Sequence, residues 1–206
     1  YHLMPGIIGS NPKKDIEMFK EIFKNQNYKP DQIKLYPCQV LVGSKLEEIY
    51  WKGDYAPYTK EQTIAILREM IKLTPRYCRI MRIMREIPPA YLIAGIKNID
   101  LRKDIEEVIR KEKIKINEIR FREIGFALRD KREVNTQIKI KKTKYKASNG
   151  IEYFIEAINK DDILFGLLRL RLDKSKVATI RELHVYGPAL KLGEKQQEKY
   201  QHTGIG

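Results

Sequence analysis

The spacing of apolar residues changes near residue 130, and this change is the strongest constraint on how the chain can fold. Before it, short apolar runs alternate with segments whose apolar residues recur at helical spacing, which predicts strands alternating with helices. After it, runs of alternating apolar and polar residues follow one another with turn residues between them. The first pattern is typical of a parallel sheet and the second of an antiparallel one. We therefore expect an α/β part followed by an α+β part.

Residues 1–88 carry the strand and helix alternation. Asn11 and Pro12 suit the cap and first turn of a helix. The arginines of 79–85 recur every third residue, but the β-branched content and the prolines behind it favour a strand, with Arg79 and Arg85 on one face. The strands are too few to close a barrel, so we expect the C-terminal part of a larger, TIM-like barrel. The expected strands are 3–4, 33–36 and 79–85, and the expected helices are 15–23, 47–51 and 60–73.

Residues 89–129 are expected to form a basic connector between domains, with a turn region at Leu92–Gly95 and a charged helix over 101–112. Residues 130–206 are expected to form an antiparallel meander, because Asn149-Gly150 between two alternating runs is a strong hairpin signal. The expected strands are 138–148, 152–157, 163–172 and 176–185.

The charge balance points to an anionic partner. Lys and Arg number 41 against 27 Asp and Glu, a formal net charge of +14. No run of about 18 apolar residues could cross a bilayer, and the first residues do not resemble a signal peptide, so we expect a cytoplasmic protein with no membrane partner. Cys38 and Cys78 are the only cysteines and stand far apart, which excludes a CxxC pair or a thiolate set for an iron–sulfur cluster within this chain.

A turn of the form Q-x-x-G-x-G spans Gln201–Gly206 and follows the last expected strand. Such a turn can point several backbone N–H groups into one concavity, and glycine lets a diphosphate approach the backbone. The alternative is a frayed terminal segment. His184 and His202 are candidate general bases, although a structural role is the more common one for a strand histidine.

At this point the sequence resembles a known family, the catalytic subunit of Elongator, a radical-SAM and GNAT enzyme that carboxymethylates uridine 34 of tRNA. The resemblance covers essentially the whole chain, and we take it to be a partial chain of an archaeal member. The motifs that carry it, in the family's order, are HLMPG (2–6), DIEMF (15–19), KLYP (34–37), GDYAPY (53–58), RIMRIMREIP (79–88), RFREIG (120–125), YKASNG (145–150), RELHVYGP (181–188) and QHTGIG (201–206).

The resemblance implies a radical-SAM barrel over residues 1–88, which uses S-adenosylmethionine and a [4Fe–4S] cluster, and the N-terminal half of a GNAT acetyltransferase-like domain over 130–206. In the family's chemistry a 5′-deoxyadenosyl radical takes hydrogen from the acetyl methyl group, the carbon adds to C5 of the wobble uridine, and the thioester is hydrolysed. The cluster cysteines, the later GNAT strands and the family's zinc-binding cysteines have no counterpart here, so we expect no metal bound by this chain. The implied acetyl-CoA-binding residues are Glu182, Leu183, His184, Val185, Gln201, His202, Thr203, Gly204 and Gly206.

Clustered basic residues predict a tRNA-binding surface, because phosphates are neutralised by Lys and Arg. Tyr36, Tyr55, Tyr58 and Tyr91 are candidates for stacking on bases. The alternative is that these cations are solvated faces, as the lysine run of 139–146 is expected to be. The predicted tRNA-binding residues are Arg79, Arg82, Arg85, Lys97, Arg120, Arg122, Arg169 and Arg171.

Three functions remain open on the sequence alone. The first is the tRNA-modifying enzyme, the second a protein or amine N-acetyltransferase with the same acetyl-CoA pocket, and the third a non-catalytic tRNA-binding module. The catalytic residues are not assigned, and a homodimer or accessory subunits are both left open.

Overall fold

The computed structural model describes residues 1–97, 100–175 and 177–187. Contacts divide the chain into two compact units, which are described separately below. The first unit contains Tyr1–Lys24 and Pro30–Ile116, and the second contains Asn25–Lys29 and the residues from Asn117 onward. The boundary therefore falls inside the segment 89–129 that we predicted as a connector. The functions predicted for the individual domains stay predictions.

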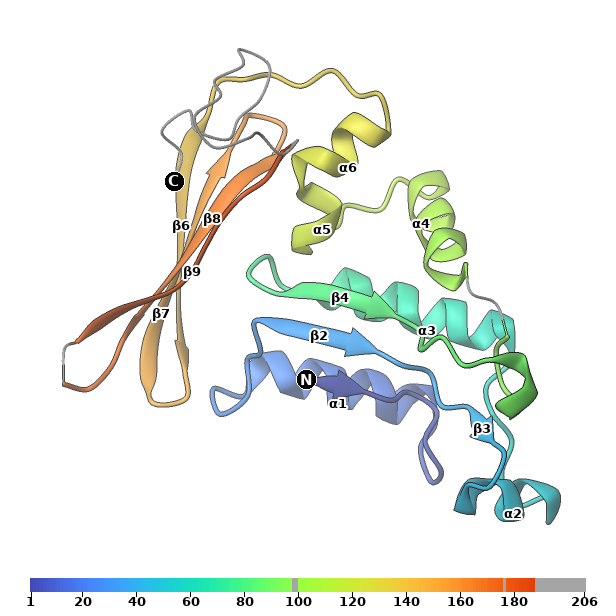
Figure 1. Cartoon of the computed structure of the whole chain (residues 1–206). Helices are drawn as coiled ribbons and strands as arrows, with labels where there is room; N and C mark the ends of the chain where they lie inside the picture. The colour runs from blue at the N-terminus through green and yellow to red at the C-terminus, as the bar shows by residue number, and fades with distance from the viewer. Residues whose placement is uncertain (98–99, 176, 188–206) are drawn as a thin grey trace. The chain divides into compact units, whose positions relative to one another are not determined.

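Three short parallel strands form the centre of the first unit, in the order β1-β2-β4. Leu3, Leu35 and Ile83 pair in one buried row across them, and α1 and α3 lie on that side of the sheet (Figure 1). The elements are β1 (His2–Leu3), α1 (Pro12–Lys24), β2 (Gln32–Leu35), β3 (Val40–Leu41), α2 (Lys45–Trp51), α3 (Lys60–Leu73), β4 (Arg79–Ile83), a 3-10 turn (Pro89–Tyr91), β5 (Leu92–Ala94) and α4 (Leu101–Lys111).

Capping residues set the starts of two of these helices, and the first of them, Asn11, was predicted. The backbone N–H of Lys14 donates to Asn11 Oδ1 at 3.0 Å, which caps α1. Thr59 and Gln62 form a reciprocal capping box at the start of α3. Two expectations were wrong. The Leu92–Gly95 region contains strand β5, which pairs with β3, and β4 ends at Ile83, so Arg85 does not share a strand face with Arg79.

The charged helix predicted over 101–112 is α4, and it belongs to the first unit. Its buried face includes Leu101 and Ile105. Lys60 and Asp104 approach to 2.8 Å, and Arg68 and Glu112 to 2.6 Å, so α4 is joined to α3 by ion pairs as well as by apolar packing.

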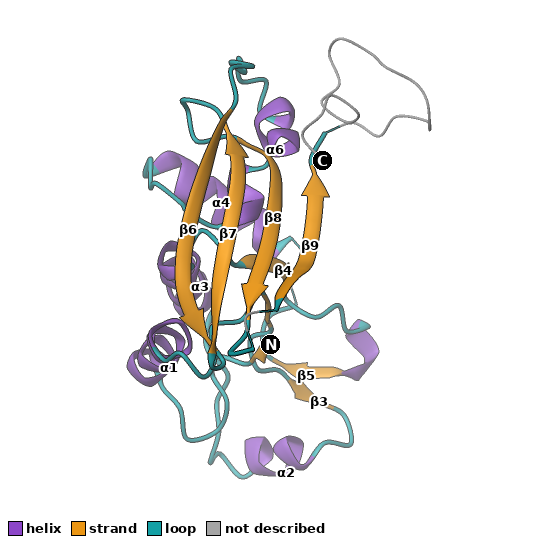
Figure 2. Ribbon diagram, turned by 90° about the vertical axis from the view of Figure 1, so that its left-hand side faces the viewer, coloured by secondary structure: helices purple, strands orange, loops and turns teal. Residues whose placement is uncertain are grey.

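The second unit contains the predicted antiparallel meander. Its four strands pair in chain order, with β6 and β9 at the two edges (Figure 2). Phe154, Leu164 and Phe165 are fully buried in its core, and the mixed α/β character of the whole chain agrees with the predicted class. The elements are α5 (Ile119–Arg122), α6 (Ile124–Arg129), β6 (Lys139–Ala147), β7 (Gly150–Ile158), β8 (Leu164–Leu172) and β9 (Ala178–Val185).

The hairpin predicted at Asn149-Gly150 is confirmed, but the glycine serves another purpose than expected. Ala147 pairs with Gly150, so the loop residues are Ser148 and Asn149, with φ of 44° and 65°. A Cβ on Gly150 would lie 2.7 Å from the Arg171 guanidinium carbon. Glycine therefore lets the Arg171 guanidinium and the Leu172 carbonyl oxygen, 3.0 Å from the same point, approach the turn closely.

Candidate functional site

The outer edge of β9 is the first candidate site. Among the described strands β9 pairs only with β8, so half of its backbone N–H and C=O groups point away from any described strand. Four of the predicted acetyl-CoA-binding residues lie on this strand: Glu182, Leu183, His184 and Val185. The other five, Gln201, His202, Thr203, Gly204 and Gly206, lie outside the described residues.

The β9 strand has an irregular register in its centre. Arg169 pairs with Glu182 and Leu170 with Ile180, which makes Arg181 the extra residue of a β-bulge. A bulge bends a strand and increases its local twist. The bend at Arg181 directly precedes the four residues predicted to bind acetyl-CoA.

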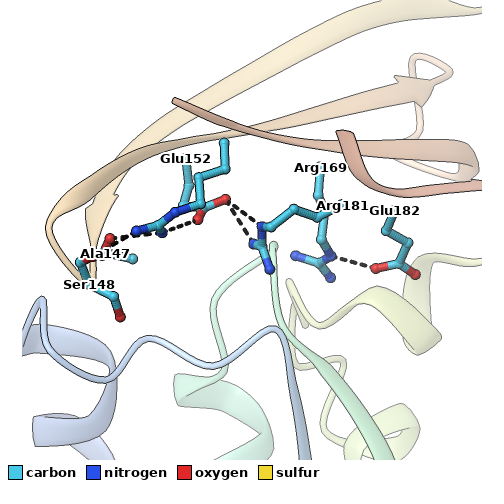
Figure 3. Close-up of polar contacts among 7 residues, drawn as sticks. Ala147, Ser148, Glu152, Arg169, Arg181 and Glu182 are labelled. Atoms are coloured by element: carbon cyan, nitrogen blue, oxygen red, sulfur yellow. Dashed lines mark hydrogen bonds and ion pairs between the residues drawn. The ribbon is translucent and has the colours of Figure 1, made fainter. Parts of the chain in front are cut away.

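Ion pairs to a buried carboxylate hold this bulge (Figure 3). Glu152 is 2% exposed, and it accepts hydrogen bonds from Arg181 Nη2 at 2.8 Å and from Arg171 Nη1 at 2.7 Å. Arg171 Nη2 also donates to the carbonyl oxygen of Ser148 at 2.7 Å. One carboxylate thus connects the β9 bulge to the β6–β7 turn through two arginines.

The side chain of Glu182 is engaged in a separate pair. Arg169 Nε donates to Glu182 Oε2 at 2.6 Å, and the guanidinium lies 5.0 Å from the centre of the Phe154 ring. Leu183 points to the opposite face of the sheet and is half exposed. His184 contacts the Tyr186 ring, with the ring centres 4.4 Å apart.

The carboxyl ends of β1, β2 and β4 form the second candidate site, because ligand sites of parallel α/β sheets lie at this end. The register places His2 beside Lys34 and Lys34 beside Arg82. Neighbouring residues in register share a face of the sheet. His2, Lys34 and Arg82 therefore form a basic row on the face opposite the buried leucines.

A small pocket follows the end of β4. Arg85 and Lys97, which we predicted to bind tRNA, both line it, together with Glu86 and Gln39. Met84, also in its wall, has a φ of 71°, a backbone conformation that is uncommon for a residue other than glycine. At this turn the chain leaves the sheet, and the residues that follow form part of the pocket wall.

A buried carboxylate holds the loop after β1. Asp15 is 3% exposed and accepts hydrogen bonds from the Gly6 N–H at 2.7 Å, Ser10 Oγ at 2.6 Å and the Tyr58 hydroxyl at 2.8 Å. The Tyr55 hydroxyl donates to the Gly6 carbonyl oxygen at 2.7 Å. Burial raises the pKa of both phenols, and the hydrogen bond to Asp15 raises the pKa of Tyr58 further. The hydroxyl groups of two predicted stacking residues thus have a structural role.

The arginines predicted to bind tRNA divide into two groups. Arg82 and Arg85 are exposed, as is Lys97, whereas Arg79 and Arg120 are half-buried. Arg122 and Arg169 have side chains only 4% and 2% exposed. Arg122 Nη1 lies 2.7 Å from Glu156 Oε1, and Arg171 binds Glu152. The burial of Arg122 and Arg169, and the engagement of Arg171 by Glu152 and Ser148, argue against RNA contact by these three residues, and the proposal below leaves them out.

His2 and Lys34 were not identified from the sequence as members of a basic row. The signal that could have found them is the strand register, which depends on where β2 and β4 pair. Single residues in short strands carry no mark of that pairing.

The described residues do not fit an iron–sulfur cluster. Cys38 and Cys78 are buried. Within the described ranges no group of three or more His, Cys, Asp and Glu side chains could hold a metal ion. No helix in the described part of the chain is both long and apolar enough to cross a membrane.

Comparison with known proteins shows what the chain resembles. Residues 30–113 match the Radical_SAM C-terminal domain family. Over 100% of its length the chain is 36% identical to a tRNA uridine(34) acetyltransferase of Dehalococcoides mccartyi and 31% identical to Elongator complex protein 3 of Homo sapiens. Over its whole length the chain thus resembles a part of the Elongator catalytic subunit.

A solved structure supports the same conclusion for the fold. The archaeal Methanocaldococcus infernus Elp3 with an N-terminal deletion superimposes with a TM-score of 0.88 at 34% identity, over 99% of this chain and 51% of that one. The chain spans 47% of the Dehalococcoides relative and 39% of the human one. It therefore spans less than half the length of each of these two relatives.

Proposed function

We propose that this chain is part of an enzyme that uses acetyl-CoA to add a carboxymethyl group to C5 of uridine 34 in tRNA. The observation that supports it most is the alignment of the entire chain with relatives named tRNA uridine(34) acetyltransferase. The first unit is then the C-terminal part of a radical-SAM barrel, and the second the N-terminal half of a GNAT-like domain. We expect it to act in the cytoplasm, as a homodimer or with accessory subunits.

Acetyl-CoA supplies the two-carbon unit that reaches the uridine. Its pantetheine arm contains amide groups, which can pair with the free edge of β9 as an added strand would. Glu182, Leu183, His184 and Val185 offer those backbone groups, because their strand ends the described sheet. The diphosphate is assigned to the Q-x-x-G-x-G motif of residues 201–206, which lies outside the described residues.

The Glu152–Arg181 pair fits this assignment. A pantetheine arm needs a strand edge that no further strand occupies, and the Arg181 bulge bends β9 just before Glu182. Because Glu152 is buried and binds two arginines, the bend is held by strong charge-assisted hydrogen bonds.

The tRNA-binding role is assigned to exposed cations near the carboxyl ends of the parallel strands of the first unit. Arg82, Arg85 and Lys97 are exposed, and Lys34 and His2 extend the row across the sheet. Arg79 remains in the proposal as a half-buried member of this unit, and Arg120 is proposed separately as a half-buried cation of the second unit. Phosphate contacts of this kind position an RNA without reading its sequence.

Membership of the radical-SAM C-terminal family supports the use of S-adenosylmethionine and a [4Fe–4S] cluster by the whole protein. Because the described cysteines do not fit a cluster, we assign neither its ligands nor any catalytic step to residues of this chain.

The test is acetyl-CoA hydrolysis by the full-length protein, followed with and without tRNA. We expect hydrolysis to be faster with a tRNA that carries uridine at position 34 than with the same tRNA carrying cytidine there. A rate indifferent to tRNA would overturn the proposal, and recovery of acetyl-lysine on a protein substrate would favour an N-acetyltransferase instead.

A further inference from the structure

Strand β6 carries a row of cations that the arginine network does not use. All of its lysines are exposed. None of them makes an ion pair with the described residues, whereas Arg122, Arg169, Arg171 and Arg181 of the same unit all do. The strand lies at the edge of the sheet opposite β9 (Figure 2). The lysines are Lys139, Lys141, Lys142, Lys144 and Lys146.

Three of these lysines stand in one line on the same face. Side chains two residues apart on a strand share a face and are about 7 Å apart, so Lys142, Lys144 and Lys146 form a regular ladder. Tyr153 lies opposite Lys144 on β7, and its ring centre is 5.7 Å from Lys142 Nζ and 5.8 Å from Lys144 Nζ. The ladder therefore runs beside a half-buried aromatic ring.

The acidic residues of β7 cannot neutralise this ladder. Glu152 and Glu156 lie opposite Tyr145 and Lys141, on the other face of the sheet. Both are buried and bind arginines. The cross-strand neighbours of the ladder are instead Ile151, Tyr153 and Ile155.

A row of like charges without counter-charges is unfavourable until an anion neutralises it. A chain of evenly spaced phosphates matches a chain of evenly spaced ammonium groups, and a tyrosine within the same row can stack on an unpaired base. RNA supplies both features, whereas an anionic membrane supplies only negative charge.

We propose that β6 is a second RNA-binding surface, on which an RNA strand lies along Lys142, Lys144 and Lys146 with a base over Tyr153. It rests on the proposed function in one respect, namely that the RNA is the substrate tRNA. Strand β6 belongs to the second unit, whereas the basic row of Arg82 belongs to the first.

The test is the triple change Lys142→Gln, Lys144→Gln and Lys146→Gln in the full-length protein. The affinity for tRNA is measured by filter binding at several salt concentrations, and acetyl-CoA binding is measured alongside. We expect the plot of log affinity against log salt concentration to become less steep by about 2 to 3, because one phosphate contact is lost for each lysine. Acetyl-CoA binding should be unchanged.

The matched control changes Lys13, Lys20 and Lys24 of α1 to Gln. These are also exposed lysines without an ion pair to the described residues, and their loss removes the same charge. We expect the control to leave the salt slope within the error of the wild type. Equal losses in both variants would show a response to net charge alone and would overturn the inference.

Two other results would also overturn it. The β6 variant could keep the wild-type slope but aggregate, which would mean that the lysines only protect a sheet edge. It could instead keep its tRNA affinity and lose binding to vesicles of anionic lipid, which would assign the surface to a membrane. Failure of the wild-type protein to bind tRNA would contradict the proposed function itself, so the two failures are distinguishable.

Discussion

Arginine has opposite roles in the two units. In the second unit Arg122 and Arg169 are almost fully buried, and each binds a carboxylate: Arg122 of α5 pairs with Glu156 of β7, and Arg169 of β8 pairs with Glu182 of β9. In the first unit Arg82 and Arg85 are exposed at the carboxyl end of the parallel strands. What differs is the residue on the neighbouring strand, because Arg169 faces Glu182 and Arg82 faces Lys34.

The comparison teaches that the cross-strand partner decides whether a strand arginine is structural or free to bind a ligand. A carboxylate in register neutralises the guanidinium and permits its burial. A lysine in register leaves it charged and in solvent. The units also secure their loops differently, the first by hydroxyl groups around Asp15 and the second by arginine pairs.

The most direct way to break the comparison is Glu152→Gln. This change leaves Arg171 and Arg181, whose side chains are 26% and 30% exposed, without their shared counter-charge. Because solvent reaches both arginines, we expect the free energy of unfolding of the second unit to fall by about 1.5–3 kcal/mol, the range for a hydrogen bond to a charged group. Denaturant unfolding followed by hydrogen exchange at β7 and β9 amides would measure it.

The control for this change is Glu107→Gln on α4, an exposed glutamate of the first unit. Its effect should stay within about 0.5 kcal/mol, as for most surface substitutions. A loss below about 1 kcal/mol for Glu152→Gln would show that the arginines do not depend on this carboxylate.

Gly150→Ala probes the same network through packing. The new Cβ would lie 2.7 Å from Arg171 Cζ and 3.0 Å from the Leu172 carbonyl oxygen. The guanidinium must therefore move away from Glu152 and Ser148, and we expect a loss of about 1–3 kcal/mol, typical of overpacking. Combining it with Glu152→Gln should cost less than the sum of the two, because both changes act on Arg171. Additive losses would contradict this coupling.

More of the fold than of the candidate site could be predicted from the sequence. The hairpin at Ser148-Asn149, the helix cap at Asn11 and the four-strand meander follow from local turn chemistry and alternation. Strands β3 and β5 were missed because two- and three-residue strands carry too little pattern to detect.

The site depended on information that local patterns do not contain. Arg169 and Arg171 look like exposed cations in a run of leucines, and only the register with Glu182 and Glu152 shows that they are paired. Residues that alternate with Leu168 and Leu170 on a strand share one face of the sheet. The alternation did not show that this face is the buried one, since burial depends on what covers the sheet.

Arg82→Gln with Arg85→Gln sharpens the other side of the comparison. Both side chains are exposed, so we expect an unfolding free energy close to that of the wild type. The slope of log tRNA affinity against log salt should fall by about 2. Arg169→Gln should give the reverse, a destabilised second unit with an unchanged salt slope. An unchanged slope in the Arg82 and Arg85 variant would remove these residues from the tRNA-binding proposal.

The smallest expected effect concerns the first unit, which holds its loop by hydroxyl groups. Burial and Asp15 raise the pKa of the Tyr58 phenol, so the folded state favours its neutral form. The resulting stabilisation is complete below the unfolded pKa of about 10 and is lost as the pH rises through the folded value. Tyr58→Phe should therefore lower stability by about 1 kcal/mol below pH 10, through the lost hydrogen bond, and by less above it. Thermal unfolding at a series of pH values measures this effect. The matched control is Tyr91→Phe, because the Tyr91 side chain is exposed. An identical pH dependence of stability in the two variants would show that the Tyr58 proton is not linked to folding.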